Sequence, residues 1–273
     1  MDILNHLSPR RFRTVDDLLA FISIYDDTRR TTAYRALLRA HRKLIRNSVC
    51  VEGGAGLALF SVELARLGAR KVYAVEQNSL LARLAQNRID RLPKNLRERI
   101  EIVNKPLQQF KPREAVTALV QEFYGQLLYD EDLWVLDRLR FTPHIVLPNG
   151  GELWAGIVSS ANYKDRVVTT ETVKSLGGVL VSGLFQEQFN ELTMPVLRWR
   201  YGQGLQQVQH NFKTLRGDML CLGLRVTHNG TTVCEAGKCP NWSYAWTQRK
   251  GNKISLTFKK SSGTMESYVR WVG

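Results

Sequence analysis

Two glutamates near the middle of the chain could together hold a planar cation. Glu122 and Glu131 lie nine residues apart, on either side of a glycine turn. They follow the apolar run 116–120, which is typical of a buried strand. Ligands of open α/β sheets bind beyond the carboxyl ends of the strands. A pair of carboxylates at that position favours a substrate with several N–H donors in one plane, such as a guanidinium.

A glycine-rich turn upstream predicts a second binding feature. The turn contains Gly54 and Gly56, and the predicted strand before it ends in Glu52. Glycines let the backbone approach a ligand closely, and the helix that follows adds partial positive charge at its N-terminus. Glu76 ends the next predicted strand, where a carboxylate can accept hydrogen bonds from both hydroxyls of a ribose. The pattern therefore predicts a nucleotide-type cofactor.

The details of this turn favour S-adenosylmethionine over a dinucleotide. The third glycine of the dinucleotide fingerprint is missing. The carboxylate of Glu52 at the strand tip would repel a pyrophosphate but would tolerate a sulfonium and an amino group.

The elements around these residues predict a parallel sheet. Apolar runs that read as strands alternate with amphipathic segments that read as helices, which is typical of an α/β fold with helices on both faces of the sheet. The expected strands are 47–52, 71–76, 99–103 and 116–120, and the expected helices are 15–24, 31–45, 57–67, 79–92 and 131–139. From residue 152 onwards, short alternating runs between turns predict antiparallel β structure. We therefore expect a Rossmann-like domain over 1–151 and a β-barrel-like domain over 152–273.

The composition indicates a soluble, strongly basic protein. The chain has 273 residues, 44% of them hydrophobic, and a formal net charge of +14, which favours polyanionic partners. Its four cysteines show neither a disulfide framework nor the spacing of a zinc site, so we expect no metal. No secretion signal is evident at the N-terminus, and no apolar stretch approaches the ~20 residues of a membrane span. We expect a cytoplasmic location and no membrane partner.

The chain from about residue 24 to about residue 155 resembles the protein arginine methyltransferase family. Val49–Gly56 resembles the family's first cofactor motif, and Leu67–Glu76 follows it without a gap. Glu122–Glu131 matches the family's double-glutamate loop at the same spacing, and Leu147–Gly151 resembles the turn before the family's β-barrel.

The resemblance implies an S-adenosylmethionine-dependent N-methyltransferase that modifies an arginine guanidinium in a peptide or protein. The two glutamates would hold the guanidinium. Arg30 would bind the carboxylate of the cofactor, with Arg29 as the neighbouring alternative. Glu76 would bind the ribose, and Leu107 and Gln108 occupy the positions that border the adenine.

The chain departs from the family in the loop that lines the acceptor pocket. That loop carries a Thr-His-Trp sequence in the family, and we match it here to Tyr244–Trp246, which lacks the histidine. On this match Trp246 is expected to line the substrate pocket together with Tyr124 and Tyr129. The family's helical dimerisation arm is not evident, so a homodimer does not follow from the sequence.

Three other functions stay open at this point. A methyltransferase of free arginine would need side chains for the amino and carboxyl groups of the amino acid. An RNA methyltransferase would use the basic stretches at 249–253 and 259–260. A catalytically silent scaffold would explain the missing histidine. Because a net charge of +14 repels basic tails, a peptide or protein acceptor is expected to be acidic or bound to nucleic acid.

Overall fold

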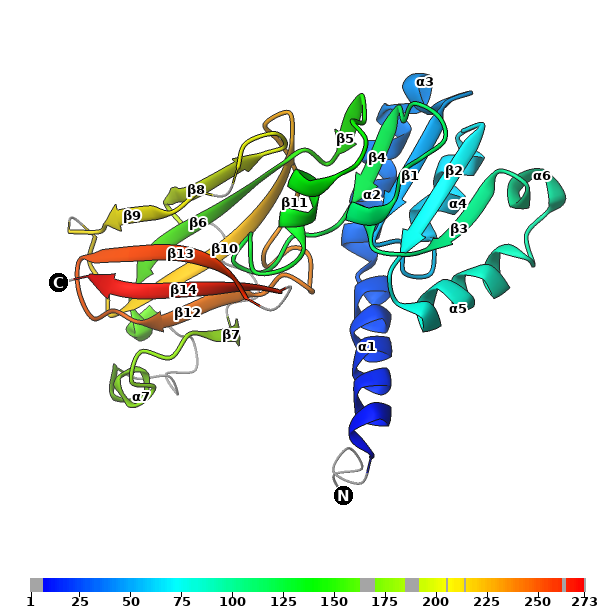
Figure 1. Cartoon of the computed structure of the whole chain (residues 1–273). Helices are drawn as coiled ribbons and strands as arrows, with labels where there is room; N and C mark the ends of the chain where they lie inside the picture. Colours follow the sequence, from blue (N-terminus) through cyan, green and yellow to red (C-terminus); the bar gives the residue numbers. More distant parts are fainter. Residues whose placement is uncertain are drawn as a thin grey trace.

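The chain folds into a helix-covered parallel sheet followed by an antiparallel β domain (Figure 1). The computed structural model describes residues 7–162, 170–184, 192–204, 206–213, 215–261 and 264–272. The two parts lie side by side, and the first helix projects from the body of the molecule (Figure 1). The α/β prediction for the N-terminal half is confirmed.

The parallel sheet has five strands in the order β3-β2-β1-β4-β5. The strands are β1 (Val49–Gly53), β2 (Lys71–Glu76), β3 (Ile100–Asn104), β4 (Ala118–Gln121) and β5 (Ile145–Leu147). Every residue of β1 and β4 is buried, because helices or the β domain cover both faces. The register pairs Gly53 with both Val75 and Gln121, so the carboxyl ends of β1, β2 and β4 meet at one edge of the sheet.

Helices surround this sheet, and local capping explains where several of them begin. They are α1 (Pro9–Asp26), α2 (Thr28–Ala40), α3 (Arg42–Ile45), α4 (Leu59–Arg66), α5 (Ser79–Ile89) and α6 (Lys94–Arg97). Asp27 ends α1 and also caps α2, since its carboxylate accepts a hydrogen bond from the backbone N–H of Arg30. Asn78 caps α5 in the same way.

One predicted helix is wrong in type. Residues 131–139 were expected to form an α-helix, but the structure has a 3₁₀ helix, η3 (Leu133–Arg138). No side chain caps its N-terminus, and Leu133–Leu136 are all buried. A segment that is buried on all sides lacks the one-sided apolar pattern that favours an α-helix. Shorter elements are η2 (Leu107–Gln109), η4 (Ser160–Asn162) and α7 (Thr170–Ser175).

The β domain consists of two antiparallel sheets. Its strands are β6 (Gly150–Val158), β7 (Val181–Leu184), β8 (Met194–Arg200), β9 (Val208–Asn211), β10 (Met219–His228), β11 (Thr231–Glu235), β12 (Tyr244–Gln248), β13 (Lys253–Ser261) and β14 (Thr264–Val272). One sheet has the order β7-β12-β10-β6-β8 with β11 beside β10, and the other has the order β14-β13-β9. Among the described residues these strands form two sheets, so a closed barrel stays a prediction. The predicted domain boundary at 151/152 falls inside β6.

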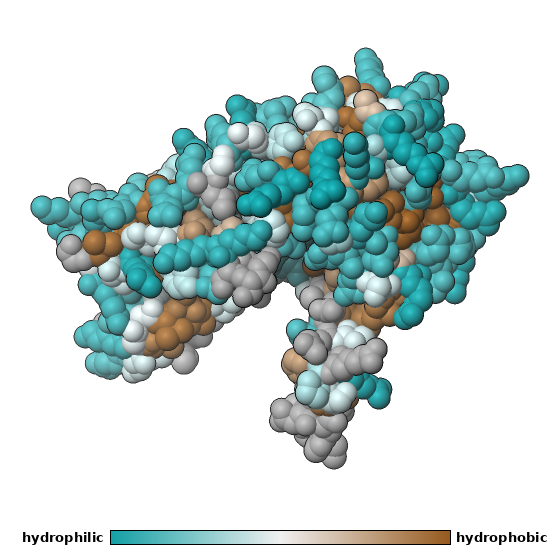
Figure 2. Space-filling view, in the orientation of Figure 1, coloured by the Kyte–Doolittle hydropathy of each residue, from teal (hydrophilic) through white to brown (hydrophobic). Residues whose placement is uncertain are grey.

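Apolar side chains join the two domains through one continuous core. Val51 and Leu119 from the parallel sheet belong to the same buried cluster as Leu153 and Leu224 of the β domain. A second cluster fills the opposite face of the parallel sheet. Hydrophilic residues cover most of the face seen in Figure 2, and apolar residues gather there only in small patches.

The cysteines correct one expectation from the sequence. Cys234 and Cys239 form a disulfide with a Cα–Cα distance of 6.4 Å, while Cys50 and Cys221 are buried and lie outside this bond. The spacing rules for cysteines detect frameworks of several disulfides. They did not predict this single disulfide, which closes a short loop. In the part of the chain that the structure describes, no helix is long and apolar enough to cross a membrane. No three His, Cys, Asp or Glu side chains gather there at a distance suited to a metal.

Candidate functional site

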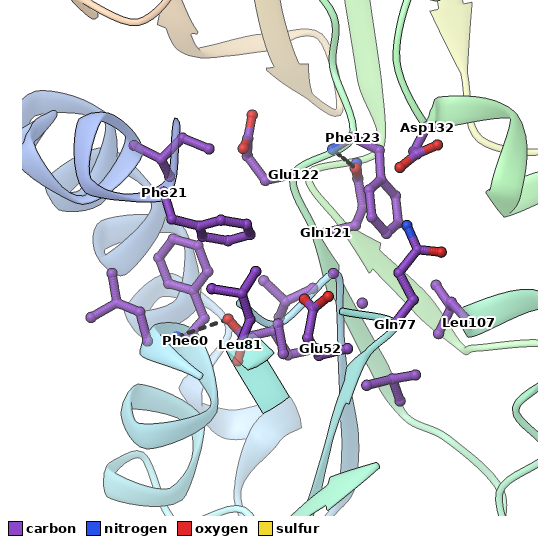
Figure 3. Close-up of a pocket in the computed structure, with 18 of the residues that line it drawn as sticks. Phe21, Glu52, Phe60, Gln77, Leu81, Leu107, Gln121, Glu122, Phe123 and Asp132 are labelled. Carbon is purple, nitrogen blue, oxygen red and sulfur yellow. Dashed lines mark hydrogen bonds between the residues drawn. The ribbon is translucent and has the colours of Figure 1, made fainter. Parts of the chain in front are cut away.

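A cavity of about 400 Å³ lies at the carboxyl ends of β1, β2 and β4. The rings of Phe21 and Phe60 stand on one side of it and the side chains of Gln77 and Leu107 on the other (Figure 3). The structure brings eight of the predicted site residues together at this cavity: Arg30, Glu52, Gly54, Glu76, Leu107, Gln108, Glu122 and Glu131. Residues from five separate segments of the chain thus meet in one place.

Glu52 lines the cavity, but its carboxylate is committed to the start of α4. It accepts hydrogen bonds from the backbone N–H groups of Phe60 (3.0 Å) and Ser61 (2.6 Å), the first of which is drawn in Figure 3. The Ser61 hydroxyl donates to the same carboxylate. Burial raises the pKa of Glu52 to about 7, although these hydrogen bonds oppose the shift. Glu52 therefore fixes the glycine turn relative to α4.

Glu76 is held in place by the same turn. Its carboxylate accepts hydrogen bonds from the backbone N–H of Gly56 (2.8 Å) and from that of Asn78 (2.7 Å). Burial raises its pKa. Each carboxylate oxygen keeps a second lone pair, so the group can still accept from a ligand hydroxyl. Gly56 itself does not line the cavity and acts through Glu76.

Helix α1 closes the cavity from the side of the glycine turn. Phe21 and Tyr25 line the cavity, and the Tyr25 hydroxyl accepts a hydrogen bond from the backbone N–H of Leu57 at 2.9 Å. Gly56 has a φ of +52°, and a Cβ added there would overlap the ring of Phe21. The missing side chain at Gly56 is what allows α1 to pack on the turn.

We expect Gly56→Ala to weaken ligand binding in the cavity by about tenfold or more, because the new methyl group must displace Phe21 and disturb the N–H that holds Glu76. Gly177→Ala is the matched control, since Gly177 also has a left-handed φ (+63°) but open space around it. Both variants carry the backbone strain, of about 1–2 kcal/mol. Calorimetric titration with S-adenosylhomocysteine and thermal melting measure the two effects. Equal losses of affinity in both variants would contradict the role of the Phe21 contact.

Arg30 lines the cavity and connects Glu122 with the last turn of α1. Its Nη1 lies 3.1 Å from Oε2 of Glu122, and its Nη2 donates to the Ile24 carbonyl at 2.8 Å. Arg30 is only 4% exposed. Burial raises the pKa of Glu122 to about 7, and the charge of Arg30 opposes the shift. The neighbouring Arg29 instead donates to the Lys238 carbonyl of the β domain, so Arg30 is the arginine that faces the cavity.

Glu131 lies near other carboxylates. Its side chain reaches solvent and lines the cavity together with Asp132. The surrounding protein removes it in part from bulk water, which raises its pKa to about 8, and the charges of Glu122, Asp130 and Asp132 add to the shift. Among the described residues that line the cavity, several carboxylates thus gather with Arg30 as their cation, an arrangement that favours a cationic ligand.

Three predicted pocket residues lie in the core and do not line this cavity. Tyr124 is 1% exposed, and its hydroxyl donates to the Gly150 carbonyl at 3.0 Å. Tyr129 is equally buried and packs edge-on against Phe258. Trp246 is buried within β12, in the middle of a sheet. All three rings belong to the buried cluster that spans both domains, where large apolar side chains gain most from burial.

Two residues that the sequence reasoning missed lie next to Arg30. The ring centroid of Trp242 is 5.7 Å from the guanidinium carbon of Arg30, within the range of a cation–π contact. The preceding residue, Asn241, forms hydrogen bonds with Ser23 and Asp27. The loop of the β domain that contacts Arg30 and the α1–α2 junction is therefore Pro240–Trp242. The tryptophan at the third position of this tripeptide, as in Thr-His-Trp, was the sequence signal that could have identified the loop.

The sequence is similar to protein arginine methyltransferases over about two thirds of its length. It is 29% identical over 184 residues to protein arginine N-methyltransferase 6 of Danio rerio, which covers 62% of this chain and 52% of that protein. It is also 29% identical over 184 residues to a probable histone-arginine methyltransferase CARM1 of Oryza sativa subsp. indica, covering 66% of this chain and 32% of that protein. The chain spans about half the length of these relatives or less. No family model matches the chain.

Solved structures share the fold over nearly the whole chain. Protein arginine methyltransferase 10 of Arabidopsis thaliana superposes with a TM-score of 0.64 at 15% identity and covers 91% of this chain and 95% of its own. A PRMT1 enzyme-prozyme complex of Trypanosoma brucei with AdoHcy superposes with a TM-score of 0.68 at 13% identity and covers 93% of each chain. The chain is thus similar in sequence to protein arginine methyltransferases over about two thirds of its length, and it shares the fold of these solved structures over nearly all of it.

Proposed function

We propose that the protein is an S-adenosylmethionine-dependent N-methyltransferase that modifies an arginine guanidinium in a peptide or protein. The observation that carries this proposal is the placement of Glu122 and Glu131 at the same cavity as the glycine turn and Glu76. One cavity thus offers a nucleoside-type site and a pair of carboxylates suited to a guanidinium.

The residues at the strand ends fit the methyl donor. Arg30 supplies a cation for the carboxylate of the methionine part, and Glu76 supplies acceptor oxygens for the ribose hydroxyls. Leu107 and Gln108 also line the cavity and would border the adenine. A Cβ at Gly54 would overlap the ring of Phe123. Because Gly54 has no side chain, its backbone can come close to both that ring and the ligand. When bound, S-adenosylmethionine supplies an electrophilic methyl group on its sulfonium.

The two glutamates would orient and activate the acceptor. A guanidinium is a weak nucleophile because its charge is spread over three nitrogens. Glu122 and Glu131 hold its N–H groups and draw the positive charge towards the nitrogens that they contact, which leaves the reacting nitrogen richer in electrons. Their raised pKa values also make them better proton acceptors after transfer. Positioning of the reacting nitrogen supplies the rest of the rate enhancement.

The surface charge supports an acceptor that is acidic or bound to nucleic acid. The segment 28–51, which includes α2 and α3, contains no Asp or Glu. Arg39, Arg42 and Arg46 are exposed along this segment, and Figure 2 shows a mainly hydrophilic surface. Such a surface attracts polyanions and repels basic tails at low salt. A cytoplasmic location and the state of assembly stay predictions from the sequence.

Transfer of a labelled methyl group from S-adenosylmethionine to a peptide panel tests the proposed function. The panel contains acidic and basic arginine peptides, the same peptides with lysine in place of arginine, free arginine, and RNA. We expect transfer to acidic arginine peptides and none to their lysine counterparts. Transfer to free arginine or RNA alone would replace the proposed acceptor. Donor binding without transfer to any of them would point to a silent scaffold.

A further inference from the structure

Exposed arginines line the amino edge of the parallel sheet, the edge at which its strands begin. This edge lies opposite the cavity, because the strands are parallel and the cavity is at their carboxyl ends. In Figure 1 it is the upper margin of the domain, where α3 lies, and Figure 2 shows mostly hydrophilic residues there. The segments that lead into β1, β2, β3, β4 and β5 each contribute an exposed arginine, in chain order Arg46, Arg66, Arg97, Arg113 and Arg140.

The fold brings these five arginines from distant parts of the chain to one surface. The backbone N–H of Asn47 donates to the Gly68 carbonyl at 2.9 Å, which joins the segments before β1 and β2. The N–H of His144 donates to the Val116 carbonyl at 3.1 Å, which joins the segments before β5 and β4. Neighbouring strands pair in parallel throughout the sheet. Because such strands lie 4.7–4.9 Å apart, the amino edge is about 19 Å long.

The carboxylates near this edge do not balance its positive charge. Glu114 pairs with Arg70 at 2.5 Å, and Glu98 pairs with Lys94 at 3.8 Å. In the part of the chain that the structure describes, none of the five arginines forms an ion pair. The carboxylates of the cavity gather at the opposite edge. The sheet therefore has one basic edge and one acidic edge.

The chemistry of the amino edge fits the phosphates of a nucleic acid duplex. A guanidinium presents its N–H donors in a fork that matches two phosphate oxygens. A duplex carries one charge per 1.7 Å of its axis, so an edge of this length faces about eleven phosphate charges. Single-strand binders instead stack bases on exposed aromatic rings. The exposed large apolar side chains of the described residues lie on α1 and at Val179, so this edge offers cations to a backbone.

We propose that the amino edge of the parallel sheet binds a nucleic acid duplex through its phosphates. This binding goes beyond the methyl transfer proposed above and requires no ligand in the cavity, because the two surfaces lie at opposite ends of the strands. The acidic edge is then turned away from the phosphates. A duplex held at the amino edge would bring proteins bound to the same duplex close to the cavity without occupying it.

Fluorescence anisotropy with a labelled DNA duplex of about 20 base pairs, measured at several salt concentrations, tests this proposal. For five phosphate contacts we expect log K to fall with log [salt] at a slope of about −4 to −5. The combined variant Arg46→Gln, Arg113→Gln, Arg140→Gln should lower the magnitude of the slope by about 3 and weaken binding at low salt at least tenfold.

A matched control separates a specific surface from the effect of net charge. The combined variant Lys174→Gln, Lys213→Gln, Arg216→Gln removes three exposed cations from the part of the chain that follows β6. It has the same net charge as the first variant and should bind the duplex within about twofold of wild type. Equal losses in the two variants, or no binding of the duplex by the wild-type protein, would overturn the proposal.

Further measurements separate duplex binding from stability, from other polyanions and from the proposed function. Both combined variants should match wild type in thermal melting and in calorimetric titration with S-adenosylhomocysteine. If the first variant failed to fold, Arg113→Gln alone should still lower the slope by about 1. An acidic peptide of equal charge that displaced the duplex as well as unlabelled duplex does would overturn the assignment to nucleic acid. If the wild-type protein bound no donor, the proposed function would fail, and the anisotropy would still decide on the amino edge.

Discussion

We expect Glu122→Gln to lose methyl transfer by about 10³-fold while it retains donor binding. The amide has nearly the shape of the carboxylate but lacks its charge, so it cannot draw the charge of a guanidinium, and its N–H₂ group opposes the N–H groups of the acceptor. Loss of one preorganised electrostatic contact typically costs 10²–10³ in kcat, and Glu122 also holds the acceptor. The measurement is single-turnover transfer from labelled S-adenosylmethionine, with donor affinity determined separately by calorimetry.

The structure provides a control for this substitution and a reason for the retained donor binding. Glu114→Gln removes a carboxylate that pairs with Arg70 on the surface, far from the cavity, and should keep full activity. In Glu122→Gln, Arg30 loses its carboxylate partner and becomes more available to the donor, so donor affinity should not fall. Full transfer by Glu122→Gln would remove this residue from the reaction. Loss of donor binding as well would indicate a structural role for the ion pair.

The second large effect concerns pH, because the rate of transfer should rise at least tenfold between pH 6 and pH 9. Burial raises the pKa of Glu122 to about 7. Partial removal from water, together with the neighbouring carboxylates, raises that of Glu131 to about 8, so both are largely protonated at pH 6. A protonated carboxyl cannot hold a guanidinium as an ion pair, so transfer requires the ionised forms that predominate at higher pH. Because the carboxyls of Glu122 and Glu131 interact, the dependence of the rate on pH gives apparent pKa values of the pair and not of either residue alone. The value of kcat/KM for the acceptor, measured at saturating donor, gives the profile, because it reports the pKa values of the enzyme without bound acceptor.

Stability should change with pH in the opposite direction. Each folded-state pKa lies above the unfolded value, so the stabilising contribution is complete below the unfolded pKa near 4.5 and is lost as pH rises to about 8. Because the Glu131 side chain reaches solvent, which weakens the effect, Glu131→Gln should melt only slightly above wild type at pH 9 and show no such advantage at pH 5, while its activity falls. Glu98→Gln, on the exposed end of α6, controls for the loss of a surface carboxylate. An advantage that is equal at both pH values would contradict the raised pKa.

The part of the site that lies on the parallel sheet could be predicted because its signals are local. Buried runs followed by glycine turns mark strand ends, and parallel strands bring those ends to one edge. Glu52, Glu76 and Glu122 follow from this rule alone. Arg30 followed from a resemblance, since an arginine on a helix has no spacing that distinguishes it from a surface residue.

The contribution of the β domain could not be predicted in the same way. Trp242 lies in an irregular loop whose sequence has no periodic apolar pattern. Its place beside Arg30 depends on how the two domains pack. Tyr124 follows Glu122 by two residues, so sequence alone allows it to face either the cavity or the core. Its position is decided by the carbonyl of Gly150, which comes from a different domain. Contacts between distant segments thus account for each misplaced residue.

In the proposed function, the ion pair between Arg30 and Glu122 would make the two substrates thermodynamically dependent on each other. A donor carboxylate that draws the charge of Arg30 leaves Glu122 less neutralised, and Glu122 then attracts a cationic acceptor more strongly. Reciprocity requires the acceptor to strengthen donor binding by the same factor. The spent donor keeps its carboxylate, so it benefits equally. An excess of acceptor would therefore retain the spent donor and slow turnover, which sets an upper limit to the useful acceptor concentration.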